Sequence, residues 1–201
     1  MSALDFLSVG AAAEADGFTP LARSSLERSF RDAGATFADR GGWSVPVSVP
    51  NEQEHLQHVG IADLTHLTKL EVRPGGVPAD LATDCYKVWY DLSARRSLVF
   101  CDASDAEKVR ATLGGRLVVD VTAALSILAL TGPEAPTLLR RLTHLHHFPS
   151  GGELAHVTAH VLEQPPGYWI VFPQEYGYYL YDVAVDCATP LGGGPIGVDA
   201  L

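Results

Sequence analysis

The stretch Gly60-Ile-Ala-Asp-Leu-Thr-His-Leu-Thr-Lys-Leu-Glu-Val-Arg73 decides the fold that this sequence predicts. From Lys69 to Arg73, charged residues alternate with apolar ones, which is the period-two pattern of a strand with one buried face. Asp63, Thr65 and His66 come before it, and short polar side chains of this kind hydrogen-bond back onto a turn. The stretch therefore predicts a polar turn that leads into a half-buried strand.

Composition places the chain among ordinary globular proteins. Its 201 residues are enough for one domain with a sizeable core, or for two closely fused halves. Hydrophobic residues make up 47% and charged residues 19%, which is not the composition of a disordered chain. The formal net charge of −10 argues against a general nucleic-acid binder, because neutralising phosphates requires surplus Lys and Arg.

The cysteines and the N-terminal residues suggest a reducing compartment. Cys85, Cys101 and Cys187 are scattered and form no C-x-x-C pair, so we expect reduced thiols and neither a disulfide frame nor a zinc knuckle. Met1 to Gly17 carries acidic residues and no basic region, unlike a signal peptide. No apolar run approaches 18 residues, so we expect a cytoplasmic protein that does not span a membrane.

The region before the opening stretch predicts an arm, a helix and an extended segment. Residues 1–20 are Ala-rich, Gly-rich and weakly patterned, and we interpret them as an N-terminal arm. Pro20 to Ala38 has apolar residues at helical spacing, which predicts a helix. Trp43 to Pro50 alternates but carries prolines that suit only an edge strand or an extended wall. Asn51 to His58 predicts a short helix with Asn51 as its N-cap.

The rest of the chain predicts the same order of elements twice. After the opening strand we expect a helix, two strands, a helix and a strand, at Val77–Thr83, Tyr86–Leu92, Ser97–Cys101, Ser104–Leu113 and Leu117–Val121. We then expect a strand, a helix, two strands, a helix and a strand, at Ser126–Leu130, Glu134–Leu142, Ala155–Leu162, Tyr168–Phe172, Tyr178–Ala188 and Pro195–Val198. The prediction is an α+β fold of two fused split βαβ (ferredoxin-like) units, about 60–121 and 122–201, within a domain of residues 21–201 that begins with a helix.

Four segments, in order, resemble the folate-binding aminomethyltransferase superfamily, which includes the glycine-cleavage T-protein, the YgfZ proteins and the gamma subunit of heterotetrameric sarcosine oxidase. They match a G-[IV]-x-D-[LV]-[ST]-H signature, a strand-G-P-x-A-helix, a G-E-x-G-Y-E stretch and a G-x-x-G-x-x-A segment, and lie at Gly60–His66, Leu128–Ala135, Pro173–Tyr178 and Gly194–Leu201. Each match is weak alone, but the ordered set is fairly specific. The resemblance implies the folate-binding domain of the T-protein type.

The departures from that pattern are informative. The G-G-x-x-D-D segment, which supplies the acid thought to assist one-carbon transfer in T-proteins, does not occur; Gly75 to Trp89 is short, and Asp84 is the nearest acid in order. The YgfZ hallmark K-G-C-Y-x-G-Q-E is missing, and up to Leu201 there is neither the arginine-bearing segment nor the later barrel domain of T-proteins. A scaffold without the acid resembles the sarcosine oxidase gamma subunit best.

This resemblance implies an accessory subunit of a heteromeric flavin-dependent sarcosine oxidase-like amine oxidoreductase, linked to tetrahydrofolate one-carbon metabolism. FAD, FMN and NAD would then belong to partner subunits, and the chain itself shows no clear site for them. The alternative is a stand-alone minimal tetrahydrofolate-dependent one-carbon transferase, or an enzyme repurposed from the same pocket. A homo-oligomeric binding protein is a third alternative. The enzyme predicts a concave pocket where Asp63, His66 and Glu175 converge, whereas the subunit predicts a broad apolar surface instead.

Candidate site residues are few. Asp63 and His66 are the catalytic candidates. We favour the alternative, an Asp that caps a turn and a packed His, because a single pair without a nucleophile or a third partner is common in protein structures. Glu175 stands where the T-protein family places a pterin-contacting Glu, with Tyr178 beside it; a carboxylate can accept paired N–H donors from a pterin ring. A solvated turn acid is an equal alternative for Glu175.

Histidines and aromatic residues complete the candidates. We expect no metal site, because the five histidines of the second half lack carboxylate or Cys partners at ligand spacing: His144, His146, His147, His156 and His160. His156 and His160 are expected to share the face of one strand, at a spacing too long for a compact chelate. The densest aromatic cluster indicates a partner-binding surface in addition to core packing, at Tyr168, Trp169, Phe172, Tyr176, Tyr178, Tyr179 and Tyr181. Trp43 and Trp89 are core candidates.

Overall fold

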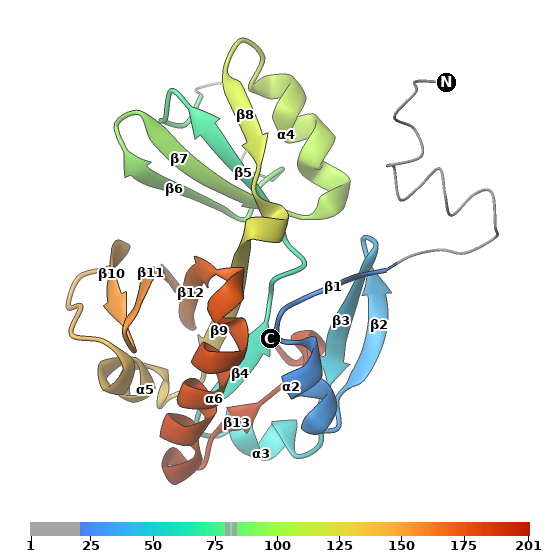
Figure 1. Cartoon of the computed structure of the whole chain (residues 1–201), viewed down its shortest axis with the longest axis vertical. Helices are drawn as coiled ribbons and strands as arrows, with labels where there is room; N and C mark the ends of the chain where they lie inside the picture. Colours follow the sequence, from blue (N-terminus) through green and yellow to red (C-terminus); the bar gives the residue numbers. More distant parts are fainter. Residues whose placement is uncertain (1–20, 79–80, 82–83) are drawn as a thin grey trace, which may run out of the picture.

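The computed structural model describes residues 21–78, 81 and 84–201. Its main body has four layers: two helices, a six-stranded sheet, a four-stranded sheet and a further helix, with a small three-stranded sheet beside them (Figure 1). This is a mixed α+β architecture, which confirms the predicted fold class. The N-terminal arm, residues 1–20, lies outside the described residues.

The six-stranded sheet is the centre of the molecule. Its order is β10 (Ser150–Leu154), β11 (Val157–Gln164), β12 (Gly167–Pro173), β9 (Leu125–Thr131), β4 (Gly60–Asp63) and β13 (Gly194–Pro195). Neighbours pair antiparallel as far as β4, and β13 joins β4 in parallel. Among the described residues, the first half of the chain therefore contributes only β4 to this sheet.

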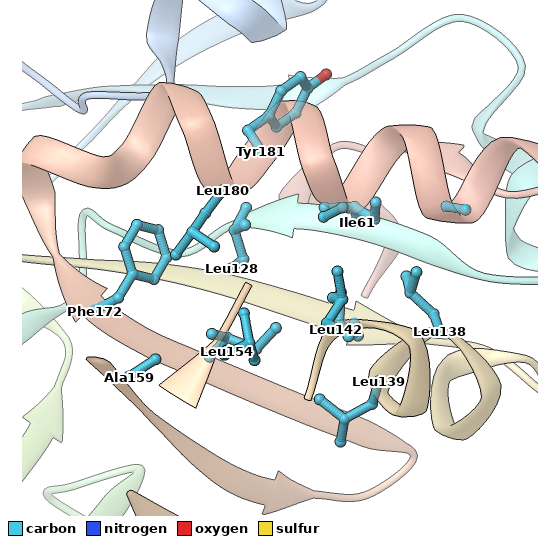
Figure 2. Packing of buried hydrophobic residues seen from close by; sticks show 14 of the residues in the cluster. Ile61, Leu128, Leu138, Leu139, Leu142, Leu154, Ala159, Phe172, Leu180 and Tyr181 are labelled. Carbon is cyan, nitrogen blue, oxygen red and sulfur yellow. The ribbon is translucent and has the colours of Figure 1, made fainter. Parts of the chain in front are cut away.

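Two helices cover one face of this sheet, α5 (Ala135–Leu142) and α6 (Gly177–Ala188). Figure 2 shows Leu138, Leu139 and Leu142 of α5 and Leu180 of α6 directed at the strands, where Leu128 lies between them. All five are at most 5% exposed. Burying each such side chain contributes roughly 1.5–3 kcal/mol, so this layer holds the sheet and its helices together.

The other face of the six-stranded sheet packs on the four-stranded sheet. That sheet has the order β6 (Val88–Ser93), β7 (Arg96–Cys101), β5 (Thr68–Arg73) and β8 (Leu117–Asp120), all antiparallel. Ile127 and Val171 from the larger sheet meet Tyr90 and Phe100 from the smaller one. Helix α4 (Ala106–Thr112) follows the 3-10 turn η2 (Ala103–Asp105) and covers the outer face, over a core that includes Leu70 and Val109.

The N-terminal part forms the three-stranded sheet, in the order β1 (Ala22–Arg23), β3 (Trp43–Ser48) and β2 (Thr36–Arg40). Helix α2 (Glu27–Asp32) packs into the main core through Leu26 and Phe30, and α3 (Glu52–Leu56) precedes β4. Further 3-10 turns are η3 (Thr122–Ala124), η4 (Gln174–Tyr176), η5 (Thr189–Leu191) and η6 (Val198–Ala200).

The long helix predicted over Pro20–Ala38 is wrong in its extent. Only Glu27–Asp32 is helical, because Gly34 takes a left-handed conformation (φ 81°) that ends the helix, and a strand begins at Thr36. The predicted edge strand at Trp43–Pro50 is also corrected, since β3 lies between β1 and β2. Pro46, the proline within β3, is tolerated because β1 is short and pairs only with Trp43 and Ser44.

The predicted cap at Asn51 is wrong. Asn51 has a left-handed backbone (φ 63°) and its side chain makes no cap hydrogen bond. The carboxylate of Glu52 instead accepts hydrogen bonds from the backbone N–H groups of Val49 (2.9 Å) and Gly197 (3.1 Å). Ser104, the first residue of the helix predicted at Ser104–Leu113, lies inside the 3-10 turn Ala103–Asp105, and the residue before the α-helix is Asp105.

The opening stretch differs from the prediction in two ways. Gly60–Asp63 is a strand, not a turn, and the turn is confined to residues 64–67 between β4 and β5. Strand β5 is buried on both faces: Lys69 is 0% exposed and Glu71 8%. The reason is tertiary, because β5 lies inside its sheet between β7 and β8 while α4 and the larger sheet flank that sheet.

The second half follows the prediction closely, with three differences. Strand β10 was not expected, and Ala155 and His156 form the turn that joins it to β11, both with positive φ. His156 therefore does not share a strand face with His160 as expected. The last strand is shorter than expected, and Val198 belongs to η6. The helix predicted at Val77–Thr83 falls partly outside the described residues, and the division into two units stays a prediction.

Candidate functional site

A cavity of about 500 Å³ lies where the three sheets meet. The elements around it are the β4–β5 turn, strand β9, the β11–β12 hairpin, the ends of β2 and β7, and η6. The lining residues are Arg40, Leu64, His66, Leu67, Lys87, Asp102, Ala129, Leu130, Thr131, Gln164, Pro165, Pro166, Gly167, Trp169, Val198 and Leu201. A second cavity of about 230 Å³ shares Arg40, His66 and Asp102 with it. Together they are large enough for a small organic ligand.

The apolar wall comes from close backbone packing in the β11–β12 hairpin. Gly167 lies against strand β9 so closely that a Cβ atom there would be 1.8 Å from the carbonyl oxygen of Leu130. Only glycine allows this approach. The hairpin turn Pro165-Pro166-Gly167, which the sequence predicts, thereby becomes one side of the cavity, with the half-buried Trp169 beside it.

The rim of the cavity carries charged side chains in ion pairs. The ammonium of Lys87 lies 3.0 Å from the carboxylate of Asp102, and the guanidinium of Arg40 lies 3.1 Å from Asp199. Both pairs are about half exposed to solvent, so each contributes little to stability. They place two cations near the entrance, where a ligand carboxylate can compete for them.

His66 is the imidazole of this site. It is half-buried, and its Nδ1 atom is enclosed without a hydrogen-bond partner among the described residues. Burial, and then the charge of Lys69, lower the pKa of His66 to about 4. A neutral imidazole with an unused nitrogen can accept a hydrogen bond or a proton from a ligand.

Asp63, the other catalytic candidate, does not line the cavity. It is 2% exposed, and its carboxylate accepts hydrogen bonds from the hydroxyl of Ser24 and from the Thr65 N–H (2.9 Å). Burial raises the pKa of Asp63, while the hydrogen bonds and Lys69 act against that rise. These contacts are those of an Asp that caps a turn, which is the non-catalytic alternative favoured from the sequence. Asp63 and His66 belong to one turn but do not converge on one ligand position.

Glu175 and Tyr178, the candidate folate contacts, lie elsewhere. Both are exposed, on η4 and on the first turn of α6, and neither lines the cavity. Tyr176 (44% exposed), Tyr178 (53%) and Tyr179 (42%) form an exposed group that we call the tyrosine surface. Phe172 and Tyr181, by contrast, are in the core, and Trp43 and Trp89 are only half-buried.

Lys69 is the residue that the sequence pattern missed. Its side chain is fully buried and its ammonium donates to three backbone carbonyls, those of Thr65 (2.6 Å), Leu67 (2.9 Å) and Thr122 (3.1 Å). In an alternating strand a lysine is expected to face solvent. The sequence offers little signal for this burial, because Lys69 alternates with Leu70, Glu71 and Val72 as a solvent-facing residue of a strand would.

The histidines do not form a metal site. No group of three or more His, Cys, Asp or Glu side chains with metal-binding geometry occurs in the described part of the chain. His160 instead contacts the hydroxyl of Tyr90 at 3.2 Å across the two sheets. Within residues 21–78, 81 and 84–201, no helix is long and apolar enough to cross a membrane.

The known proteins most informative for this fold are aminomethyltransferases, although no family model matches the chain. The enzyme of Frankia alni is 30% identical over 159 residues, covering 61% of this chain and 44% of that protein. The enzyme of Mycobacterium avium is 26% identical over 227 residues, covering 90% and 61%. The chain thus spans about half the length of the curated relatives that it matches.

Two solved structures share the fold. The glycine cleavage system aminomethyltransferase T of Bartonella henselae matches 90% of this chain and 60% of its own, with a TM-score of 0.69 and 20% identity. A chain of the heterotetrameric sarcosine oxidase of Corynebacterium sp. U-96 matches 86% of this chain and 97% of its own, with a TM-score of 0.58 and 16% identity. Both structures show the fold of this chain, and the sequence relatives are aminomethyltransferases, so the chain is similar to the folate-binding aminomethyltransferase superfamily.

Proposed function

We propose that this chain is an accessory subunit of a heteromeric, flavin-dependent amine oxidoreductase of the sarcosine oxidase type. The observation that carries the proposal is the dispersal of the candidate catalytic residues. Asp63 is occupied by Ser24 and Thr65, while Glu175 lies in solvent on another part of the surface. A transferase needs its acid and its ligand contacts in one place.

The match in size supports the same proposal. The fold covers 97% of the sarcosine oxidase chain but only 60% of the aminomethyltransferase. FAD, FMN and NAD would be bound by the partner subunits. The tyrosine surface is the face that we assign to the flavoprotein partner, since exposed tyrosines are enriched at protein interfaces.

Reconstitution tests this proposal. The flavin-containing subunits of a heterotetrameric sarcosine oxidase are purified without the oxidase subunit that has the same fold as this chain. They are then mixed with this chain, and the mixture is analysed by size-exclusion chromatography. We expect co-elution, lost in the Tyr178→Ser/Tyr179→Ser double variant. Leu117→Ser is the matched control, because Leu117 is equally exposed (57%) on the distant strand β8. A chain that remains a monomer in the mixture contradicts the proposal.

A second candidate function rests on the 500 Å³ cavity. Its apolar wall suits a flat heteroaromatic ring, Nδ1 of His66 offers an unused acceptor, and Arg40 and Lys87 stand at the rim for a carboxylate. The residues therefore fit tetrahydrofolate in outline, with a one-carbon transferase as the activity. Tetrahydrofolate would supply the one-carbon carrier, while this chain would hold the ring and exclude water.

Isothermal titration calorimetry with tetrahydrofolate separates the two functions. Micromolar binding by the chain alone, weakened at least about tenfold in Trp169→Ala, would favour the transferase over the pure subunit. Heat signals no larger than those of buffer dilution would exclude tetrahydrofolate as the ligand of this cavity. Tyr178→Ser is the control, because Tyr178 lies outside the cavity lining.

A further inference from the structure

Lys69 is a buried cation whose ammonium makes no direct ion pair with a carboxylate of the described residues. Its side chain is 0% exposed, and within the described chain its ammonium meets carbonyls at 2.6, 2.9 and 3.1 Å, not a carboxylate. An ammonium has three N–H donors, so these contacts use its full capacity. Burying a charge is costly unless every donor is satisfied, so this arrangement depends on the three carbonyls staying in place.

The three carbonyls belong to the two connections between the large sheets. Thr65 and Leu67 lie in the turn from β4 to β5, and Thr122 begins η3, between β8 and β9. The backbone of Lys69 reinforces the same junction: its N–H donates to the Thr122 hydroxyl (3.0 Å), and its carbonyl accepts from Val121 (2.9 Å). Lys69 therefore ties both connections together.

One of these connections is a wall of the cavity. Thr65 and Leu67 flank His66, so two of the three Lys69 bonds hold the backbone on either side of the imidazole. Leu64, His66 and Leu67 all line the cavity. The position of the His66 ring thus depends on the lysine behind it.

Electrostatic interaction also couples Lys69 and His66. The positive charge of Lys69 is the second cause, after burial, that lowers the pKa of His66 to about 4. Burial lowers the pKa of Lys69 itself to about 7, with Asp63 and Asp120 acting in the opposite direction. The other charged groups that face His66 are Asp102, Lys87 and Arg40, and those that face Lys69 are Asp63 and Asp120.

We propose that Lys69 is a positioning residue for the cavity: through its three bonds to backbone carbonyls its ammonium fixes the turn 64–67, and with it the His66 ring, and loss of the Lys69 proton loosens this restraint. A neutral amine has two N–H donors instead of three, so one buried carbonyl loses its partner. The cavity wall then responds to pH through a group that no ligand touches. This inference does not depend on the proposed function, because it concerns the free chain.

NMR titration of His66 tests the coupling, with the resonance assigned through His66→Gln. In Lys69→Met, which keeps the length of the side chain, we expect the pKa of His66 to rise by about one unit or more, a tenfold gain in proton affinity. Lys69→Arg keeps the charge and is expected to retain most of the low pKa. Lys108→Met is the matched control, since Lys108 is exposed on α4. A His66 titration that is unchanged in folded Lys69→Met overturns the proposal.

Amide hydrogen exchange distinguishes positioning from general destabilisation. In Lys69→Met we expect amides of residues 64–67 and 122–124 to exchange at least about tenfold faster, while Val171 in β12 keeps its protection. Uniformly faster exchange would show a merely structural lysine and contradict the proposal.

The wild-type chain provides a test that no folding defect can obscure. With ¹⁵Nζ-labelled lysine, the titration of Lys69 is followed from pH 6 to 9 alongside the His66 ring signals. We expect the His66 signals to show an inflection at the pH where Lys69 loses its proton. Ring signals that stay flat through that pH overturn the proposal.

Discussion

The hydroxyl of Ser24 donates a hydrogen bond to the buried carboxylate of Asp63, 39 residues further along the chain. This contact joins the segment between β1 and α2 to the end of β4, within the stretch that resembles the signature of the aminomethyltransferase superfamily. Thr65 completes the arrangement, since its N–H donates to the same carboxylate and its hydroxyl accepts from the Ile127 N–H at 3.1 Å. The acid of the signature thus holds three parts of the chain together.

Removing the Asp63 carboxylate is therefore expected to destabilise the fold strongly. We expect Asp63→Ala to lower the free energy of unfolding by about 3 kcal/mol, because the Thr65 N–H is left buried without an acceptor. Ser24→Ala removes one hydrogen bond and is expected to cost about 1 kcal/mol. Urea unfolding measures both, with the exposed Ser104→Ala as control. Equal effects of the two variants would contradict the central position of Asp63.

The lowered pKa of His66 predicts a loss of stability in acid. The unfolded chain binds this proton near pH 6.5, whereas the folded chain binds it only near pH 4. Between these values the unfolded state holds more protons, so this contribution is complete above pH 6.5 and disappears as the pH falls to 4. Allowing for the part of the ring that faces the cavity, we expect it to amount to about 2 kcal/mol.

Urea unfolding at pH 7 and pH 4 measures this effect in the wild type and in His66→Gln. On acidification we expect the free energy of unfolding of the wild type to fall by about 2 kcal/mol more than that of the variant. His146→Gln is the control, because His146 is exposed. Identical pH profiles of wild type and His66→Gln would show that His66 is not held neutral by the fold.

Gly167 is expected to be the glycine least tolerant of change in the cavity. A Cβ atom there would lie 1.8 Å from the carbonyl oxygen of Leu130, which belongs to a buried strand and cannot move aside. We expect Gly167→Ala to cost on the order of 3 kcal/mol or more. Gly114→Ala is the control, since its nearest neighbouring atom is 3.4 Å away. Thermal unfolding that shifts equally in both variants would contradict the close approach.

The aromatic cluster is expected to divide into core and surface residues on mutation. Phe172→Ala removes a ring that is 1% exposed and is expected to cost about 3–5 kcal/mol. Tyr178→Ala removes an exposed ring and is expected to change stability by less than about 0.5 kcal/mol. Chemical denaturation compares them. A large loss in Tyr178→Ala would show that the tyrosine surface supports the chain itself, not a partner.

The sequence alone was sufficient where one local pattern decides the structure. The helix at Ala135–Leu142, the hairpin at Pro165–Gly167 and the two strands before α4 follow from periodicity and turn chemistry. Between Pro20 and Ala38 the apolar residues recur at helical spacing throughout, although the segment contains a short helix and the start of a strand. The pattern therefore could not show that Gly34 separates the two. The superfamily motifs identified the fold because their order along the chain is more specific than any one of them.

The tertiary structure alone decided the burial of Lys69 and the place of the cavity. Alternation along a strand shows that one face is buried, but the fate of the other face depends on which sheet packs over it, and that sheet is formed mostly by residues after Thr122. In the same way, Asp63 and His66 are three residues apart, yet one points into the core and the other lines a cavity. Spacing brings candidate residues together in the sequence, and only packing decides which of them face a common space.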